Sequence, residues 1–247
     1  MILKELYKNY WRFGFISYLY DLLTPTAYLN SIESIANSVI LSRNSVILDV
    51  GCGTGQTLPF LKNSISNGAF YVGIDVLKNG LIKVNSKSKK LTIEKNVICL
   101  QTDFTQGLPI KVDSVDFIIC HFASYIINNL EDRKRLFNDF FEILKSGGSI
   151  AIANPSIEYC PEKIIHESLL SDIKSKTSLI MLIWKYLIYS LAKFLGLNYI
   201  KSQLQSGVWK GFTKEELIND TSQAGFDIIS VKEVYGKSAF LVVAEKR

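Results

Sequence analysis

The stretch that decides the fold covers residues 46–55 and reads VILDVGCGTG. Its first five residues are mostly apolar and β-branched, which predicts a buried strand, and a helical pattern begins at residue 56. Between strand and helix stand Gly51, Gly53 and Gly55. Because glycine accepts positive φ and lets a ligand come close to the backbone, the loop predicts a binding site.

Six further apolar runs repeat the pattern of this first strand. They cover residues 70–75, 97–100, 115–120, 149–153, 226–229 and 239–244. Apolar strands that alternate with helices are typical of a parallel sheet covered on both faces, and the short turn at residues 235–237 forces antiparallel pairing. We therefore expect a Rossmann-like α/β fold: a seven-stranded, mostly parallel sheet, an antiparallel C-terminal hairpin and helices on both faces.

Changes of periodicity divide the chain into four expected segments. These are an N-terminal helical cover (1–42), a cofactor-binding Rossmann-like core (43–155), an apolar helical insert that acts as a substrate lid (156–210), and a C-terminal helix and hairpin that complete the core (211–247). A helical face that ends near Leu144 is expected to be capped by Gly147 and Gly148.

Composition limits the class of protein more than its partners. Of 247 residues, 48% are hydrophobic and 21% charged, which is ordinary globular usage and excludes disordered or collagen-like chains. The net charge of +5 permits contact with anionic surfaces without requiring it. Four cysteines form no C-x-x-C pair, which favours a reducing, cytoplasmic setting. With two histidines and no ligand-like spacing, we expect no metal site.

Acidic residues follow or end the first three predicted strands: Asp49, Asp75 and Asp103. The glycine spacing, G-x-G-x-G, differs from the G-x-G-x-x-G of dinucleotide sites, and a carboxylate would repel phosphates while it would favour a cation. Asp75 suits the paired hydroxyls of a ribose, and Asp103 is placed to accept from an adenine amino group. The pattern predicts a pocket for a positively charged nucleoside.

Residues 46–55 resemble motif I of the class I S-adenosylmethionine-dependent methyltransferases. Other motifs of that family follow in its order: residues 73–75, 103–104, 108–109, 113–117, 144–148, 211–213 and 224–226. The resemblance covers residues 40–155 and 211–247. The Tyr20-Asp21 pair is similar to the small-molecule and quinone-type branch of the family.

This resemblance implies S-adenosylmethionine as the cofactor. Asp49 and the glycines would line its methionine part, Asp75 would bind the ribose, and Asp103 would lie on the adenine side. The residues implied in cofactor binding are Asp49, Gly51, Cys52, Gly53, Gly55, Asp75, Val76, Asp103, Phe104 and Cys120.

Four further residues are candidates for the acceptor side of the site. His121 follows the fourth strand and would serve as a general base, since histidine titrates near neutral pH, or would only shape the pocket. Tyr20, His166 and Trp184 are candidates for a substrate lid.

The insert contains a nearly continuous apolar stretch, residues 178–200, that is long enough to cross a bilayer. Lys185 and Lys193 would each cost roughly 2.5–3.5 kcal/mol near the membrane centre, so we expect that it does not span. These lysines share a helical stripe with Ser178 and Tyr189. Two interpretations stay open: a lid helix whose lysines extend outwards, or an interfacial helix that touches an anionic membrane.

We expect a methyltransferase for a small, hydrophobic acceptor such as a phenol, a quinol or a lipid-like molecule. The alternatives are a non-catalytic regulatory subunit that binds S-adenosylmethionine, and a nucleic-acid methyltransferase. Residues 120–123 read CHFA, where base-methylating members carry an Asn/Asp-Pro-Pro-aromatic turn, and the lysine run at 83–95 falls on the outer flank of the sheet. We therefore expect no nucleic-acid partner, and a cytoplasmic location with peripheral membrane contact through 178–200 left open.

Overall fold

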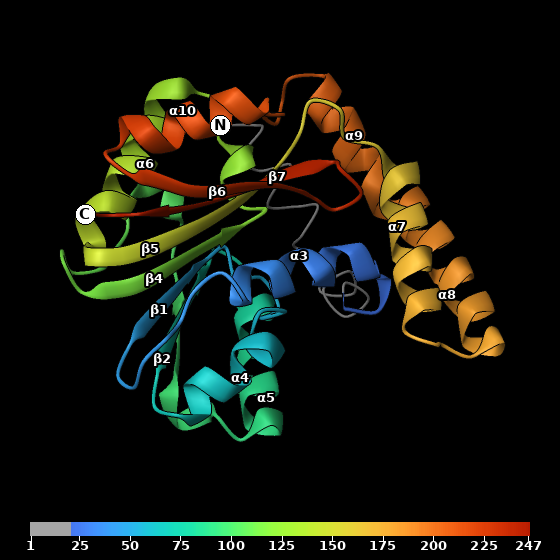
Figure 1. Cartoon of the computed structure of the whole chain (residues 1–247), viewed down its shortest axis with the longest axis horizontal. Helices are drawn as coiled ribbons and strands as arrows, with labels where there is room; N and C mark the ends of the chain where they lie inside the picture. Colours follow the sequence, from blue (N-terminus) through green and yellow to red (C-terminus); the bar gives the residue numbers. More distant parts are fainter. Residues whose placement is uncertain (1–20) are drawn as a thin grey trace.

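A seven-stranded sheet organises the chain in the computed structural model, which describes residues 21–247 (Figure 1). The strands are β1 (Val46–Val50), β2 (Phe70–Asp75), β3 (Val97–Gln101), β4 (Val115–His121), β5 (Leu144–Pro155), β6 (Asp227–Val234) and β7 (Ala239–Glu245). Their order is β3-β2-β1-β4-β5-β7-β6, and β7 runs antiparallel to both of its neighbours while the other pairs are parallel. The expected Rossmann-like sheet and its closing hairpin are confirmed.

Helices cover the two faces of this sheet because alternate side chains of each strand point to opposite sides. On one face lie α3 (Thr26–Ala36), α4 (Leu58–Ser66) and α5 (Lys78–Leu91), which pack on Ile47, Tyr71 and Phe117. On the other lie α6 (Leu130–Ile143) and α10 (Lys214–Gln223), which pack on Leu48 and Ile118. Single 3-10 turns, η1 (Glu94–Asn96), η2 (Phe104–Gln106) and η3 (Ser124–Ile126), fill three connections.

The expected glycine cap after α6 is wrong. The helix ends at Ile143, and Leu144 already belongs to β5, where it pairs with Val115. Gly147 and Gly148 therefore lie inside the strand, and the Gly147 N–H donates to the carbonyl oxygen of Lys246 at 2.6 Å. The carbonyl oxygens of Glu142 and Ile143, which a cap would have satisfied, accept instead from the N–H groups of Asp113 and Ser114, both at 3.0 Å, and the helix ends four positions before the first glycine.

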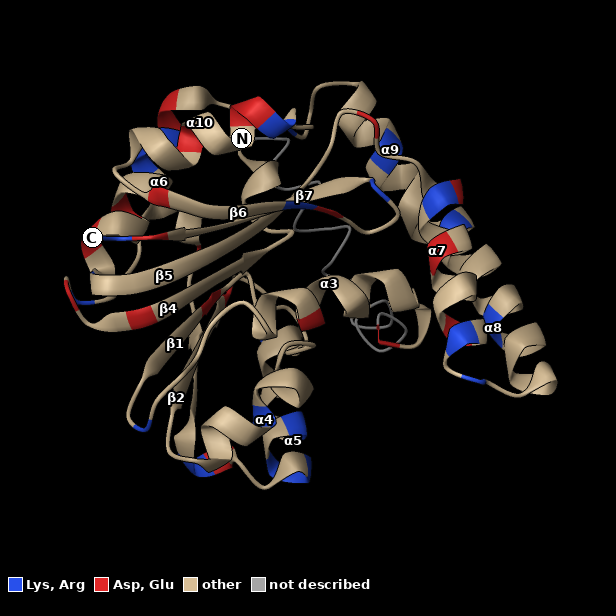
Figure 2. Ribbon diagram, in the orientation of Figure 1, with Lys and Arg blue, Asp and Glu red and all other residues tan. Residues whose placement is uncertain are grey.

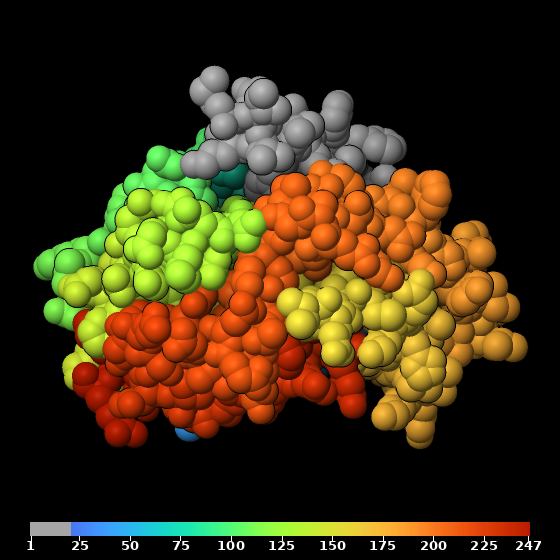
Figure 3. Space-filling model, turned by 90° about the horizontal axis from the view of Figure 1, so that it is seen from above, coloured from blue at the N-terminus to red at the C-terminus, as the bar shows by residue number. Residues whose placement is uncertain are grey.

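The insert stands at one end of the sheet, where it forms the right-hand part of the molecule in Figures 1 and 3. It consists of α7 (Pro161–Lys174), α8 (Leu179–Ala192), a π-helical turn η4 (Lys193–Leu197) and α9 (Asn198–Gln205). The last three form one continuous helix of 27 residues. By length and composition alone, this helix could cross a membrane. Only 11% of its most apolar window is buried.

Candidate functional site

A cavity of about 460 Å³ lies where β1, β2 and β4 end. The sheet order reverses between β1 and β4, and in open parallel sheets such switch points are where ligands bind. Among its lining residues are Gly51, Asp75, Val76, Asp103 and Phe104, all five of which the sequence predicted for cofactor binding. The fold thus brings together residues that are up to 53 positions apart, from Gly51 to Phe104.

The glycine loop shapes the floor of this cavity. Gly51 has φ +71°, and a Cβ atom built on it would lie 2.6 Å from the Cβ of Ala123, which also lines the cavity. Any side chain at this position would fill space and strain the backbone at once. Gly53 and Gly55 also have positive φ, +53° and +72°, but neither lines the cavity.

Asp75 is the best-placed acid of the site. The residue is 8% exposed and lines the cavity, and its carboxylate accepts hydrogen bonds from the N–H groups of Gly53 at 2.9 Å and Leu77 at 2.8 Å. Burial raises the pKa of this carboxyl despite the donors. Because each carboxylate oxygen has two lone pairs, Asp75 keeps capacity to accept hydroxyl donors from a ligand.

Asp49 does not line the cavity. Its Oδ2 atom accepts from the hydroxyls of Thr57 at 2.6 Å and Tyr71 at 2.7 Å inside the core between β1, β2 and α4. Burial raises the pKa of Asp49 to about 6. Thr57 and Tyr71 were missed by sequence reasoning; the one available signal was a tyrosine in an apolar strand, whose hydroxyl needs a buried partner.

Asp103 and Phe104 follow β3 and enter the cavity from the side. The Oδ1 atom of Asp103 accepts from the backbone N–H of Thr105 at 3.1 Å and from its hydroxyl at 2.7 Å, which fixes the 3-10 turn. Arg135 of α6 reaches the same wall, pairs with Asp132 at 2.9 Å and donates to the carbonyl oxygen of Thr105 at 3.0 Å. Asp132 and Arg135 were not predicted.

His121 lies behind the cavity wall and not on it. Its Nε2 atom hydrogen-bonds with the Ser31 hydroxyl at 2.8 Å, and its ring packs 4.4 Å from that of Phe122, which does line the cavity. Burial lowers the pKa of His121 to about 3, so the imidazole is neutral at neutral pH. The neighbouring Cys120 is also buried away from the lining, and burial raises its pKa to about 12.

The remaining predicted residues lie away from the cavity or outside the described chain. Cys52 is buried, and burial raises the pKa of its thiol. His166 and Trp184 are exposed on α7 and α8, and neither lines the cavity. Tyr20 lies outside the described residues. Its neighbour Asp21 accepts from Thr54 at 2.6 Å and so ties the start of the described chain to the glycine loop.

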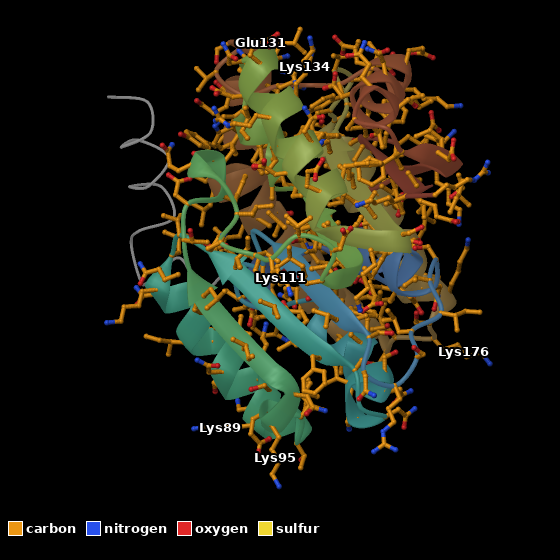
Figure 4. The ribbon with its side chains drawn as sticks, turned by 90° about the vertical axis from the view of Figure 1, so that its left-hand side faces the viewer. Lys89, Lys95, Lys111, Glu131, Lys134 and Lys176 are labelled. Carbon is orange, nitrogen blue, oxygen red and sulfur yellow. The ribbon has the colours of Figure 1, made fainter. Side chains whose placement is uncertain are left out.

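Among the described residues that line the cavity, one is basic, Arg135, and three are acidic, Asp75, Asp103 and Asp132. Lys89 and Lys95 of the lysine run point outwards at the far end of α5 and the following turn (Figure 4). Across residues 21–247 no group of three or more His, Cys, Asp or Glu side chains is arranged to hold a metal ion.

Comparisons with known proteins agree with this geometry. A family model described as "Methyltransferase domain" matches residues 41–217. The ubiquinone/menaquinone biosynthesis C-methyltransferase of Wigglesworthia glossinidia brevipalpis is 26% identical over 57% of this chain, a match that spans only 56% of that relative's length. The demethylmenaquinone methyltransferase of Oceanobacillus iheyensis is 24% identical over 76% of this chain and 72% of its own.

A solved structure shares the fold of this chain. A solved S-adenosylmethionine-dependent methyltransferase from Aquifex aeolicus superposes with a TM-score of 0.61 at 21% identity, covering 94% of this chain and 98% of that one. Because the family model covers more than half of the chain, the chain belongs to the methyltransferase-domain family, and its resemblance to the class I S-adenosylmethionine-dependent methyltransferases is confirmed.

Proposed function

We propose that the protein transfers a methyl group from S-adenosylmethionine to a small, lipophilic aromatic acceptor of the quinol or phenol type. The observation that supports this proposal is the lining of the cavity. It contains the Asp75 carboxylate and the backbone of Gly51 together with an apolar wall. That wall comprises Phe104, Phe122, Ile126, Ile127, Val208 and Trp209. The two curated relatives named above, both quinone methyltransferases by name, support the same class of acceptor.

The residues present fit the proposed cofactor. A cavity of about 460 Å³ falls within the roughly 300–1,000 Å³ of sites that enclose ligands of this size. We propose that Asp75 accepts from the ribose hydroxyls and that Asp103, Phe104 and Val76 border the adenine. The cofactor, when bound, supplies a methyl group on a positively charged sulfur, which is already a strong electrophile.

The protein's own share of the work is orientation and exclusion of water. Phe122 and Trp209 offer flat apolar surfaces against which an aromatic ring can pack, and well-oriented reactants gain on the order of 7–11 kcal/mol over free ones. His121 supports Phe122 from behind through ring contact and is itself held by Ser31. We therefore propose a positioning role for His121 in place of the general-base role that its sequence position suggested.

A lipophilic quinol dissolves in membranes, and this bears on where the protein works. We propose that the enzyme is cytoplasmic and meets its acceptor at a membrane surface, through the insert at residues 178–200. The apolar exposed side chains of α8 support this location.

The test is methyl transfer from radiolabelled S-adenosylmethionine to defined acceptors. We expect label in short-chain benzoquinols or naphthoquinols extracted into organic solvent, and no label in RNA or DNA. Label in nucleic acid alone would contradict the proposal. Cofactor binding by calorimetry without transfer to any acceptor in a lipid and metabolite extract would favour a non-catalytic subunit instead.

A further inference from the structure

The helix α8 has an apolar stripe on its solvent side. Ile180 and Leu187 of α8 and Phe194 of η4, which continues the same helix, follow one another at seven-residue spacing and are 73%, 54% and 76% exposed. Further exposed apolar residues of the same helix are Leu179, Met181, Ile183, Trp184, Tyr186 and Leu191. An ordinary surface helix directs its apolar stripe to the core and its polar stripe to water. The two faces of α8 have the opposite orientation.

The polar stripe of α8 faces the protein. Lys185 pairs with the buried Asp172 of α7 at 2.5 Å, and the Tyr189 hydroxyl donates to the same carboxylate at 2.8 Å. Thr26 of α3 donates to it at 2.9 Å, and Lys193 pairs with Glu162 of α7 at 2.6 Å. We call the group of Asp172, Lys185, Tyr189 and Thr26 the clasp.

The clasp bears on the two interpretations of the insert. In the first interpretation the lysines extend outwards, whereas in the structure Lys185 pairs with Asp172 and Lys193 with Glu162. Their ammonium groups are instead held by acids of α7, so the outer stripe consists of hydrocarbon. An exposed hydrocarbon stripe of this length indicates a surface that contacts an apolar partner.

The charge around the stripe indicates which partner covers it. Residues 173–214 contain seven lysines and no acidic residue. Three of them, Lys185, Lys193 and Lys210, pair with Asp172, Glu162 and Glu216, and the other four take part in none of the ion pairs among the described residues. Lys174 and Lys176 are exposed at the turn between α7 and α8, and Lys176 points outwards there (Figures 2 and 4). A second copy of the chain would bring the same positive charges together, whereas a bilayer with anionic lipid offers both hydrocarbon and negative headgroups.

We propose that the outer stripe of α8 lies in the interface of a membrane that contains anionic lipid, with Lys174 and Lys176 at the headgroups. The clasp stays closed in this arrangement. Spanning the bilayer would instead break the pairs of Lys185 and Lys193 and bury both charges, which is unfavourable. The inference rests on the proposed function only for its purpose, the delivery of a lipophilic acceptor.

The insert also connects the stripe to the cavity. The helix continues through η4 into α9, where Leu204 and Gln205 line a second, smaller cavity of about 260 Å³. Trp209 and Asn128 line both cavities. A lipophilic acceptor that leaves the membrane beside α9 would therefore meet Trp209 at the wall of the proposed methyl-transfer site.

Flotation of the full chain with lipid vesicles tests the proposal. We expect binding to vesicles of phosphatidylcholine with 30% phosphatidylglycerol, weaker binding to phosphatidylcholine alone, and at least about a tenfold loss of binding in the triple variant Ile180→Ser, Leu187→Ser, Phe194→Ser. Lys174→Glu with Lys176→Glu should weaken binding to the anionic vesicles only. The control is Ile82→Ser with Ile229→Ser, which removes two apolar residues elsewhere that are 55% and 57% exposed, and it should bind like the wild type.

Three outcomes would overturn the proposal. The first is unchanged vesicle binding in the triple variant. The second is a dimer, seen by analytical ultracentrifugation, that the triple variant dissolves while no form binds vesicles, since a second copy would then cover the stripe. The third concerns quenching of tryptophan fluorescence by brominated lipids. If bromine deep in the acyl chains quenched more strongly than bromine near the headgroups, the helix would span the bilayer.

Two further measurements separate this inference from the proposed function. In the triple variant, S-adenosylmethionine affinity by calorimetry and transfer to a water-soluble quinol should equal those of the wild type. Absence of cofactor binding in every form would refute the proposed function while leaving vesicle binding to be judged by itself. Loss of vesicle binding only in the triple variant, with cofactor binding intact, supports docking at the membrane.

Discussion

The rim of the cavity and the insert depart from ordinary burial in opposite directions. At the rim, the carboxylate of Asp75 is buried, whereas the continuous helix of residues 179–205 exposes large apolar side chains such as Ile180 and Phe194. Buried charge is unfavourable unless it is paired or hydrogen-bonded, and exposed hydrocarbon is unfavourable unless something covers it. Hydrogen-bond donors of the chain itself offset the cost of burying the carboxylate at the rim. No described residue covers the exposed stripe on α8 in the same way.

The clasp, like the rim, contains a buried carboxylate, and we expect that breaking it has a larger effect than the changes made to the rim and to the exposed stripe. Removing the buried Asp172 carboxylate by Asp172→Ala leaves the Lys185 ammonium and the Tyr189 hydroxyl without their acceptor. Losing one partner of a buried charged group typically costs 3–5 kcal/mol, and because Lys185 is partly exposed we expect about 3 kcal/mol. Urea denaturation monitored by circular dichroism measures this change in the free energy of unfolding.

Glu131→Ala is the control for this variant, because Glu131 forms an exposed pair with Lys134 at 3.4 Å. Exposed pairs contribute about 0–1 kcal/mol, so the control should unfold near the wild-type midpoint. If Asp172→Ala were as stable as the control, the clasp would not hold the insert in place.

At the rim, Asp75→Ala should weaken S-adenosylmethionine binding by at least about 100-fold, which corresponds to ~2.7 kcal/mol. The carboxylate is the buried acceptor that lines the cavity, and alanine offers none. Calorimetry measures the affinity, and urea denaturation of the same variant checks that the loop around Gly53 is still folded.

Asp103→Ala sharpens this test because Asp103 lines the same cavity. Its Oδ1 atom already serves Thr105, and we expect a loss of about tenfold or less, ~1.4 kcal/mol. Equal losses in the two variants would mean that Asp75 has no special share in cofactor recognition.

The rim was predictable where topology alone decides position. Parallel strands end at one edge of a sheet, so residues after β1, β2 and β3, among them Gly51, Asp75 and Phe104, had to converge. Asp49 illustrates the limit: strand alternation puts it on the same side as Ile47, towards α4, and the partners Thr57 and Tyr71 depend on tertiary packing that no local pattern encodes.

The insert was predictable in composition but not in direction. The stripe that holds Lys185 and Tyr189 could be found from helical spacing, yet which way it faces depends on Asp172, an acid on a different helix. Local periodicity gives the angle between two stripes of a helix and not the neighbour that each one contacts. The wrong glycine cap at Gly147 has the same origin, since a sheet partner decided where α6 ended.

Between the two regions, His121 should make stability depend on pH. Its pKa is lowered to about 3 in the folded chain, so below its ordinary value of 6.5 the unfolded chain binds a proton that the folded chain does not. Stability is therefore full above about pH 6.5 and falls on acidification, by at most ~1.4 kcal/mol per pH unit. Urea denaturation from pH 7 to pH 4.5 measures the slope.

The variant His121→Gln isolates this contribution because glutamine does not titrate. Asp49 acts in the opposite sense: its pKa is raised to about 6, so the stability gained by its protonated form is lost as pH rises towards 6. Subtracting the variant's slope from that of the wild type removes the share of Asp49. Parallel slopes in the two proteins would show that His121 is charged in the folded chain at these pH values.

The smallest effect is expected on the exposed stripe. Phe194→Ala removes a large apolar side chain that is 76% exposed, and surface changes of this kind usually alter stability by less than about 0.5 kcal/mol. Phe140→Ala, in the core between α6 and the sheet, is the matched change and should cost about 3–5 kcal/mol. If both variants were equally destabilised in the absence of lipid, the stripe would be covered within the chain itself. A loss confined to Phe140→Ala would mean that folding gains nothing from Phe194, as expected if its side chain contacts a surface outside the chain.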